Sequence, residues 1–277
     1  MWESVRQHLP EYAIEAALLG CFMLAACGFG ALLFHADSPV VRRIPRRLPR
    51  RALMGVAMGA TAIALIYSPW GQRSGAHMNP AASITFVMLG KMKWVDAIGY
   101  GVAHFTGAAM GVLIANAAIG RWLRHEQVNF VVTTPGRAGA GVAWIAEAVI
   151  AGGMMSLVLF SSNSPQFTGY TGLLAGALVA VYITVEAPLS GMSMNPARTF
   201  GSAIVARRWT AYWVYLTAPL CGMLAAAALF TSLPGTHVFC AKLHHPRSVD
   251  CIFRCEHDRL LIAKPANPIT PHLEASR

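Results

Sequence analysis

The chain contains one eight-residue phrase twice. Residues 74–81 read Ser-Gly-Ala-His-Met-Asn-Pro-Ala and residues 190–197 read Ser-Gly-Met-Ser-Met-Asn-Pro-Ala, so six of the eight positions are identical. The copies stand 116 positions apart, each in the second part of an apolar half-chain. Agreement over this length predicts an internal duplication. The fold therefore has to give both copies equivalent places.

The composition places this duplication in a membrane. Hydrophobic residues make up 55% of the 277 residues and charged residues only 12%, with a mean hydropathy of +0.48. The formal net charge of +10 could indicate nucleic acid, but the arginines stand in loops and tails between apolar runs. That placement favours lipid headgroups, so we expect a lipid bilayer and no nucleic-acid partner. Because no paired acid and base, nucleophile or cofactor loop is present, we also expect no enzyme.

Hydropathy predicts six membrane-spanning helices, since a hydrocarbon core of about 30 Å needs about 20 apolar residues. Two further apolar stretches, 80–89 and 196–206, are too short to span. Each begins with Asn-Pro, which suits an N-cap followed by the first helical residue, and half-helices at membrane depth line a cavity. The six expected spans are residues 12–34, 52–68, 94–119, 139–160, 170–188 and 209–233.

The order of these elements predicts an inverted repeat. Three spans separate the two Asn-Pro-Ala sequences, which we call the boxes. An odd number of spans makes one half-helix enter from each face of the membrane. We therefore predict an all-α membrane protein with six transmembrane helices and two re-entrant half-helices. The channel domain is expected over residues 1–234, with repeats at about 11–122 and 139–234, followed by a tail over 235–277.

Each half also carries one carboxylate in an apolar first helix. Glu15 lies in Ala-Ile-Glu-Ala-Ala and Glu147 in Ile-Ala-Glu-Ala-Val. Buried carboxylates in transporters can carry protons. We favour a supporting role instead, in which each accepts hydrogen bonds from the backbone of the loop before its box.

Together these residues resemble the aquaporin and glycerol facilitator family, the major intrinsic proteins. The resemblance rests on both Asn-Pro-Ala boxes, on Arg198 three residues after Asn195, and on the two glutamates, and it covers about the first 235 residues. It implies a passive channel for water or small uncharged solutes that excludes protons and ions, and a homotetramer without a required cofactor. It also implies cytoplasmic termini, and we expect a bacterial inner membrane protein.

The boxes themselves indicate how such a pore works. Each asparagine caps its half-helix and can present amide donors to an oxygen passing between the halves. The half-helix dipoles, and the permanent charge of Arg198, oppose the entry of cations. The pore boxes are Asn79, Pro80, Ala81, Asn195, Pro196 and Ala197.

The resemblance implies a four-residue constriction, found by counting from the boxes. The count gives Gly59, Ile183, Met192 and Arg198, which is an atypical filter because water-selective members carry an aromatic residue and a histidine at the first two positions. Gly59 and Ile183 suggest a wider, more apolar lumen for glycerol, urea, ammonia or a metalloid acid. The long, flexible side chain of Met192 could refill the space that Gly59 leaves. The assignment of Gly59 assumes that the count from the box contains no insertion or deletion between the helix and the box. With such a gap, Met58 or Ala60 would line the pore instead.

The tail after Leu233 gathers cysteine and histidine. Three thiols and three imidazoles lie within eighteen residues, and in a reducing compartment a metal, with zinc first, is favoured over a disulfide. Such a site could staple the tail or regulate the mouth, and the end beyond Lys264 is expected to be disordered. The candidate ligands in this stretch are Cys240, His244, Cys251, Cys255 and His257, and His245 is adjacent to His244.

Two points stay open at the level of sequence. The linker over residues 42–51 carries six arginines, which conflicts with the positive-inside tendency if the termini are cytoplasmic. Besides the passive pore, the chain could be a non-conducting or metal-sensing membrane scaffold. An alternating-access carrier is disfavoured, since nothing resembles a coupling-ion cluster beyond one carboxylate in each half.

Overall fold

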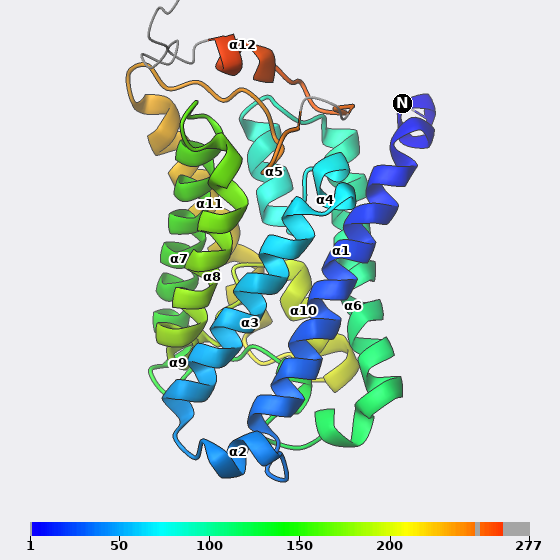
Figure 1. The fold of residues 1–277 in the computed structure, drawn as a ribbon, viewed down its shortest axis with the longest axis vertical. Coiled ribbons are helices and arrows are strands. Elements are labelled where there is room, and N and C mark those ends of the chain that lie inside the picture. The colour runs from blue at the N-terminus through cyan, green and yellow to red at the C-terminus, as the bar shows by residue number, and fades with distance from the viewer. Residues whose placement is uncertain (1, 247–249, 263–277) are drawn as a thin grey trace, which may run out of the picture.

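The computed structural model describes residues 2–246 and 250–262, and over this part of the chain it is helical, without strands (Figure 1). The expected disorder beyond Lys264 concerns residues outside the described part. The helices are α1 (Trp2–Phe34), α2 (Pro39–Arg43), α3 (Arg47–Tyr67), α4 (Pro69–Ser74), α5 (Pro80–Met88), α6 (Trp94–Leu123), η1 (Asn129–Val131), α7 (Gly139–Ser162), η2 (Thr168–Tyr170), α8 (Thr171–Val185), α9 (Ala187–Ser190), α10 (Pro196–Ala206), α11 (Tyr212–Ser232) and α12 (His257–Ile262).

Within the described residues, six helices are long and apolar enough to cross a membrane. They are α1, α3, α6, α7, α8 with the turn before it, and α11, in the order that hydropathy predicts. The short helices α5 and α10 begin at Pro80 and Pro196, each capped by the preceding asparagine. The predicted fold class is confirmed.

The packing of the helices repeats between the two halves. Helix α1 lies against α6 as α7 lies against α11, and α10 packs on α6 as α5 packs on α11. Helices α3 and α8 pair across the boundary between the halves. Each half-helix therefore packs on the last long helix of the opposite half, and α5 packs equally on α6 of its own half.

Glycines make the two closest helix contacts possible. A Cβ atom added to Gly107 of α6 would lie 2.1 Å from the backbone oxygen of Ala16 in α1. One added to Gly222 of α11 would lie 2.0 Å from the backbone oxygen of Ala148 in α7. Within a bilayer, helix association depends on such close backbone approach, because lipid is as apolar as the helices themselves.

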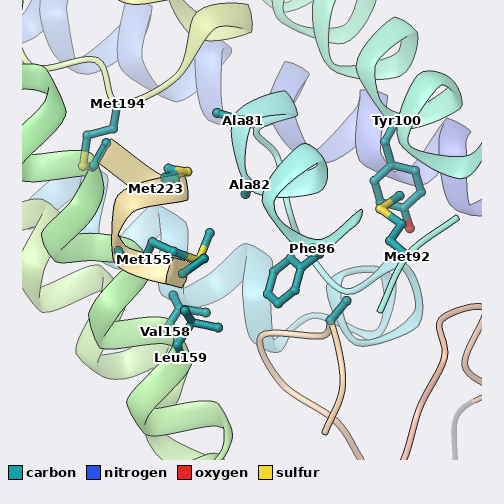
Figure 2. Packing of buried hydrophobic residues seen from close by; sticks show 14 of the residues in the cluster. Ala81, Ala82, Phe86, Met92, Tyr100, Met155, Val158, Leu159, Met194 and Met223 are labelled. Carbon is teal, nitrogen blue, oxygen red and sulfur yellow. The ribbon is translucent and has the colours of Figure 1, made fainter. Parts of the chain in front are cut away.

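Part of the apolar core lies between the second half of the bundle and the half-helix α5. Figure 2 shows Ala82 and Phe86 of α5 facing a group of methionines from the second half. These methionines are Met155 of α7, Met194 of the loop before α10 and Met223 of α11. Unbranched methionine side chains suit this irregular space between a half-helix and full-length helices.

The two ends of the bundle are different in character. The N-terminus, α12 and the segment before α12 lie at one end, and α2 with the arginine-rich linker lies at the other (Figure 1). We call these ends the tail side and the linker side. On the linker side, Arg50 is buried and donates to the backbone oxygens of Leu33 and Pro45 at 2.8 and 3.3 Å. Part of the positive charge of the linker is therefore structural.

Candidate functional site

The two copies of the repeated phrase adopt the same backbone conformation. Helices α4 and α9 end at Ser74 and Ser190, and the glycines that cap them, Gly75 and Gly191, have left-handed φ values of +96° and +87°. In the first copy Ala76 and Met78 also have positive φ values, 55° and 47°. In the second copy the equivalent residues, Met192 and Met194, both have a φ value of 55°. This pattern is uncommon for residues with a side chain, so both loops must be held in place by their surroundings.

Glu147 holds the second loop. Its carboxylate accepts hydrogen bonds from the hydroxyl of Ser190 at 2.5 Å and from the backbone N–H groups of Ser193 and Met194 at 2.8 and 2.6 Å. The side chain is fully buried. A carboxylate with three such donors is engaged with the loop and is not exposed to the lumen.

Glu15 holds the first loop in the same way, with one addition. It accepts from the hydroxyl of Ser74 at 2.6 Å and from the N–H groups of His77 and Met78 at 3.1 and 2.6 Å. His104, also fully buried, places its Nε2 atom 2.7 Å from the same carboxylate. The first loop therefore has a fourth, imidazole partner.

Two buried tyrosines complete this arrangement, and sequence reasoning missed them. The hydroxyls of Tyr100 and Tyr215 donate to the backbone oxygens of Ser74 and Ser190, each at 2.5 Å. The sequence carried a signal, because each tyrosine follows its serine at a nearly equal spacing, 26 and 25 positions. That spacing is easily overlooked in a helix rich in apolar residues.

The two box asparagines bind each other's loops. The Oδ1 atoms of Asn79 and Asn195 accept from the N–H groups of Ala81 and Ala197, each at 3.0 Å, which caps the half-helices. Their Nδ2 atoms donate to the backbone oxygens of the opposite loops, with distances of 2.7 Å for Asn79 and 2.6 Å for Asn195. Sequence reasoning left both N–H groups of each amide free for a solute. The structure corrects this, because one N–H of each amide joins the loops and one remains.

A cavity of about 1090 Å³ runs past this junction. Its walls include both box asparagines together with Ile183, Met192 and Arg198. Three of the four predicted constriction residues therefore lie on the cavity.

The fourth predicted residue, Gly59, does not. A Cβ atom added to Gly59 would lie 2.4 Å from the backbone oxygen of Gly176, so this position faces α8. Met58, its neighbour, lines the cavity instead. Counting back from the box passes through the separate helix α4, and the break at Ser68 does not preserve the rotational phase of α3.

Arg198 supplies a cationic group to the cavity wall. Its backbone N–H donates to Oδ1 of Asn195 at 3.2 Å, which fixes the start of α10. Its Nη1 atom is buried and has no hydrogen-bond partner among the described residues. A guanidinium held this way can donate to an oxygen of a passing solute, and its charge opposes cations.

These features of the fold and the cavity agree with the comparisons to known proteins. A family model described as "Major intrinsic protein" matches residues 4–230. The chain belongs to the major intrinsic protein family.

Relatives of this major intrinsic protein include plant aquaporins. It is 32% identical over 233 residues to Aquaporin NIP1-3 of Oryza sativa subsp. japonica, covering 81% of this chain and 77% of the relative. It is 32% identical over 228 residues to Aquaporin NIP2-2 of Zea mays, covering 81% and 71%. The fold is similar to the X-ray structure of the aquaglyceroporin from Plasmodium falciparum, with a TM-score of 0.65 at 18% identity, covering 82% of this chain and 96% of that one. This major intrinsic protein is an integral membrane protein and a passive channel for water and small solutes.

In this major intrinsic protein the tail cluster differs from the predicted ligand set. The donor atoms of Cys240, His245, Cys251 and Cys255 lie together, in a group that could hold a metal ion. His244 points away from them, with its ring 4.7 Å from that of Tyr67. His257 stacks on the ring of His245 at 4.5 Å and is not one of the four. The prediction is therefore wrong for His244 and His257 as direct ligands, and it left out His245. Adjacent residues of an extended segment point to opposite sides, so His245 faces the cysteines and His244 does not.

Proposed function

We propose that the channel conducts small uncharged solutes with hydroxyl groups, such as glycerol, in addition to water. The supporting observation is the two-sided wall of the cavity. Arg198 and the remaining N–H groups of Asn79 and Asn195 provide donors, while Met58 and Ile183 provide apolar surface. A polyol has hydroxyls to accept from such donors and a carbon chain to lie against the apolar side. Urea, ammonia and metalloid acids are the competing solutes of the same class.

Osmotic shock of protein-loaded liposomes tests this directly. With an impermeant sugar outside, we expect faster shrinkage than in empty liposomes. With glycerol outside, we expect shrinkage followed by re-swelling as glycerol enters. Shrinkage without re-swelling would contradict glycerol conduction, and saturable, ion-dependent flux would contradict a passive channel.

The substitution Met58→Ala tests the corrected constriction. Removing this buried side chain enlarges the cavity, so the ratio of glycerol to water permeability is expected to rise several-fold. Met110→Ala is the matched control, because Met110 is an exposed methionine on the outer surface of α6. Both variants are compared by stopped-flow light scattering. An unchanged ratio in Met58→Ala would show that Met58 does not limit the passage of glycerol.

We further propose a homotetramer whose channel domain spans residues 1–234, with both termini in the cytoplasm. In this orientation the cytoplasm would keep the three thiols of the tail reduced and available to a metal ion. Native mass spectrometry in detergent checks the tetramer. The expectation of a bacterial inner membrane stays a prediction, and the relatives described above come from plants.

A further inference from the structure

Three thiols and one imidazole of the tail meet at one point on the tail side. The ligand atoms of Cys240, His245, Cys251 and Cys255 all lie within 4.8 Å of one another. The Sγ atoms of Cys240 and Cys251 are 3.5 Å apart, and Sγ of Cys255 is 3.1 Å from Nε2 of His245. Four donor atoms from residues 240–255 thus lie around a common centre.

The spacing of these atoms fits a metal ion better than a disulfide. A tetrahedral zinc ion with Zn–S bonds of about 2.3 Å holds its sulfur ligands ~3.8 Å apart. A disulfide brings two sulfurs to ~2.05 Å. The 3.5 Å between Cys240 and Cys251 is close to the first value. Three sulfurs and one imidazole nitrogen are also a ligand set typical of structural zinc.

The imidazole of His245 is oriented for this role. Its Nδ1 atom lies 3.1 Å from the backbone oxygen of Pro246, which requires the proton on Nδ1. Nε2 then carries the free lone pair, and it is Nε2 that faces the thiol of Cys255. The ring of His257 stacks on His245 with an interplanar angle of 12°. Such second contacts fix the tautomer and orientation of a metal-binding histidine.

A buried cation beside the cluster matches its charge. Zinc with three thiolates and a neutral imidazole carries a net charge of −1. Lys242, two residues after Cys240, is only 2% exposed and donates to the backbone oxygen of Asp250, the residue before Cys251, at 2.8 Å. A buried ammonium group is stabilised by a nearby negative charge, which the metal-bound cluster provides.

We propose that Cys240, His245, Cys251 and Cys255 bind one zinc ion, which fixes the tail against the loop of the first Asn-Pro-Ala box. The metal site itself does not depend on what the channel conducts. Its effect on the mouth of the pore rests on the proposed function.

The tail makes direct contacts with the first box loop. Nε2 of His77 donates to the backbone oxygen of Ala241 at 2.8 Å, and the N–H of Leu243 donates to the backbone oxygen of Gly75 at 3.2 Å. The ring of Phe253 stacks on His77 at 5.3 Å with an angle of 13°. The ring nitrogens of His77 thus connect the loop to the tail and, through Nδ1, to the hydroxyl of a serine in α5.

A second set of contacts anchors the far end of the tail. The ammonium of Lys91 lies 2.7 Å from a carboxylate oxygen of Glu256, and the N–H of Arg254 donates to the backbone oxygen of Lys91 at 2.9 Å. The hydrogen bond from Lys91 lowers the pKa of Glu256 from its ordinary value. The tail therefore bridges the box loop and the turn after α5.

On the linker side, the loop between the halves takes the corresponding place. A Cβ atom added to Gly191 would lie 3.1 Å from Cα of Thr133, whereas one added to Gly75 would lie 2.9 Å from the ring of Phe253. The hydroxyl of Thr133 contacts that of Thr199 at 2.7 Å, in the first turn of α10. The tail thus supports the first box loop as the connecting loop supports the second. A segment with so small a core of its own needs a staple to stay folded, and a zinc ion supplies one.

The placement of the tail has a consequence for the pore. Leu243 lines the same cavity as the box asparagines. Loss of the metal is expected to release Leu243 from the cavity wall and Phe253 from the ring of His77. The zinc site therefore shapes the entrance on the tail side.

Metal analysis of the full-length protein tests the site without any measurement of flux. Protein purified in detergent without chelator is expected to contain about one zinc per chain. His245→Ala is expected to weaken zinc binding by at least the roughly 10- to 100-fold that loss of an outer-shell partner costs. His244→Ala, the adjacent histidine against Tyr67, is the matched control and should keep the metal. Equal zinc in both variants, or none in the wild type after zinc is supplied, would overturn the proposal.

Two measurements keep the test valid if a variant fails to fold. Cobalt added to the metal-free wild type should give visible absorption bands of a tetrahedral ion and a thiolate-to-cobalt charge-transfer band. Mass spectrometry after alkylation under non-reducing conditions should find all three tail thiols free once the metal is removed. Absence of the cobalt bands, or a Cys240–Cys251 disulfide in the purified protein, would exclude the zinc site.

Hydrogen exchange tests the effect on the box loop, with a control built into the repeat. Removing zinc should increase deuterium uptake in peptides covering residues 74–78 and 239–246. Peptides covering residues 190–194 should not change, because the connecting loop supports the second copy. Equal change in both copies, or no change in either, would show that the tail does not hold the first loop. If zinc binds and the exchange pattern is as expected, but glycerol does not pass, only the proposed solute would be overturned.

Discussion

Replacing Glu147 with alanine is expected to abolish solute flux and to lower the melting temperature of the purified channel. The substitution leaves three donors of the second loop without an acceptor, namely the hydroxyl of Ser190 and the N–H groups of Ser193 and Met194. An unsatisfied buried donor costs about 1–3 kcal/mol, so a destabilisation of at least about 3 kcal/mol follows. For a domain of this size, this corresponds to a decrease of roughly 6–12 °C.

The loss of flux follows from the backbone of the loop. Met192 and Met194 are held at positive φ values, and without the carboxylate the N–H groups of Ser193 and Met194 lose the acceptor that offsets that strain. Thermal unfolding in detergent and stopped-flow light scattering of liposomes measure the two effects. Asp37→Ala, which removes an exposed carboxylate between α1 and α2 that does not line the cavity, is the control and should change neither. Flux at the wild-type level in Glu147→Ala would show that the loop keeps its conformation without the carboxylate.

The second large effect is expected from Gly222→Ala. The new Cβ atom would meet the backbone of Ala148, with 2.0 Å to its oxygen and 2.8 Å to its carbonyl carbon. Backbone atoms cannot move aside as the end of a side chain can, so α7 and α11 must separate. Overpacking of a well-packed contact typically costs about 1–3 kcal/mol, and this contact lies at the upper end or beyond.

Gly141→Ala is the matched control for this contact. Gly141 lies on α7, the partner helix, and nothing lies within 4 Å of an added Cβ atom. Because alanine favours a helix over glycine, this variant is expected to be as stable as the wild type or more stable by about 0.5–1 kcal/mol. Thermal unfolding and the yield of folded protein compare the two. Equal stability of Gly222→Ala and the wild type would contradict the close approach of α7 and α11.

The pairing of the two asparagines shows where sequence reasoning stopped. The repeat predicts that Asn79 and Asn195 meet, because an odd number of spans inverts the second half. It does not predict that each amide donates to the opposite loop, at 2.7 and 2.6 Å. Hydrogen bonds across the two halves depend on the distance between them, which the packing of α3 against α8 and of the half-helices sets.

The features of the fold that depend on local chemistry and on the order of the helices could be predicted from the sequence. These are the six spans, the two half-helices capped by Asn-Pro, and the duplicated loops with one carboxylate for each. Capping and hydrophobic length are properties of a few consecutive residues, so they can be recognised without knowing the fold. The inversion of the repeat follows from the number of spans alone.

The tertiary structure alone decided which side of each element faces the site. It placed Met58 on the cavity and Gly59 against α8, and it turned His245 toward the cysteines and His244 toward Tyr67. In each pair, two neighbouring residues point in different directions. A count along the chain loses that direction wherever a helix breaks or a segment is irregular, and only packing restores it.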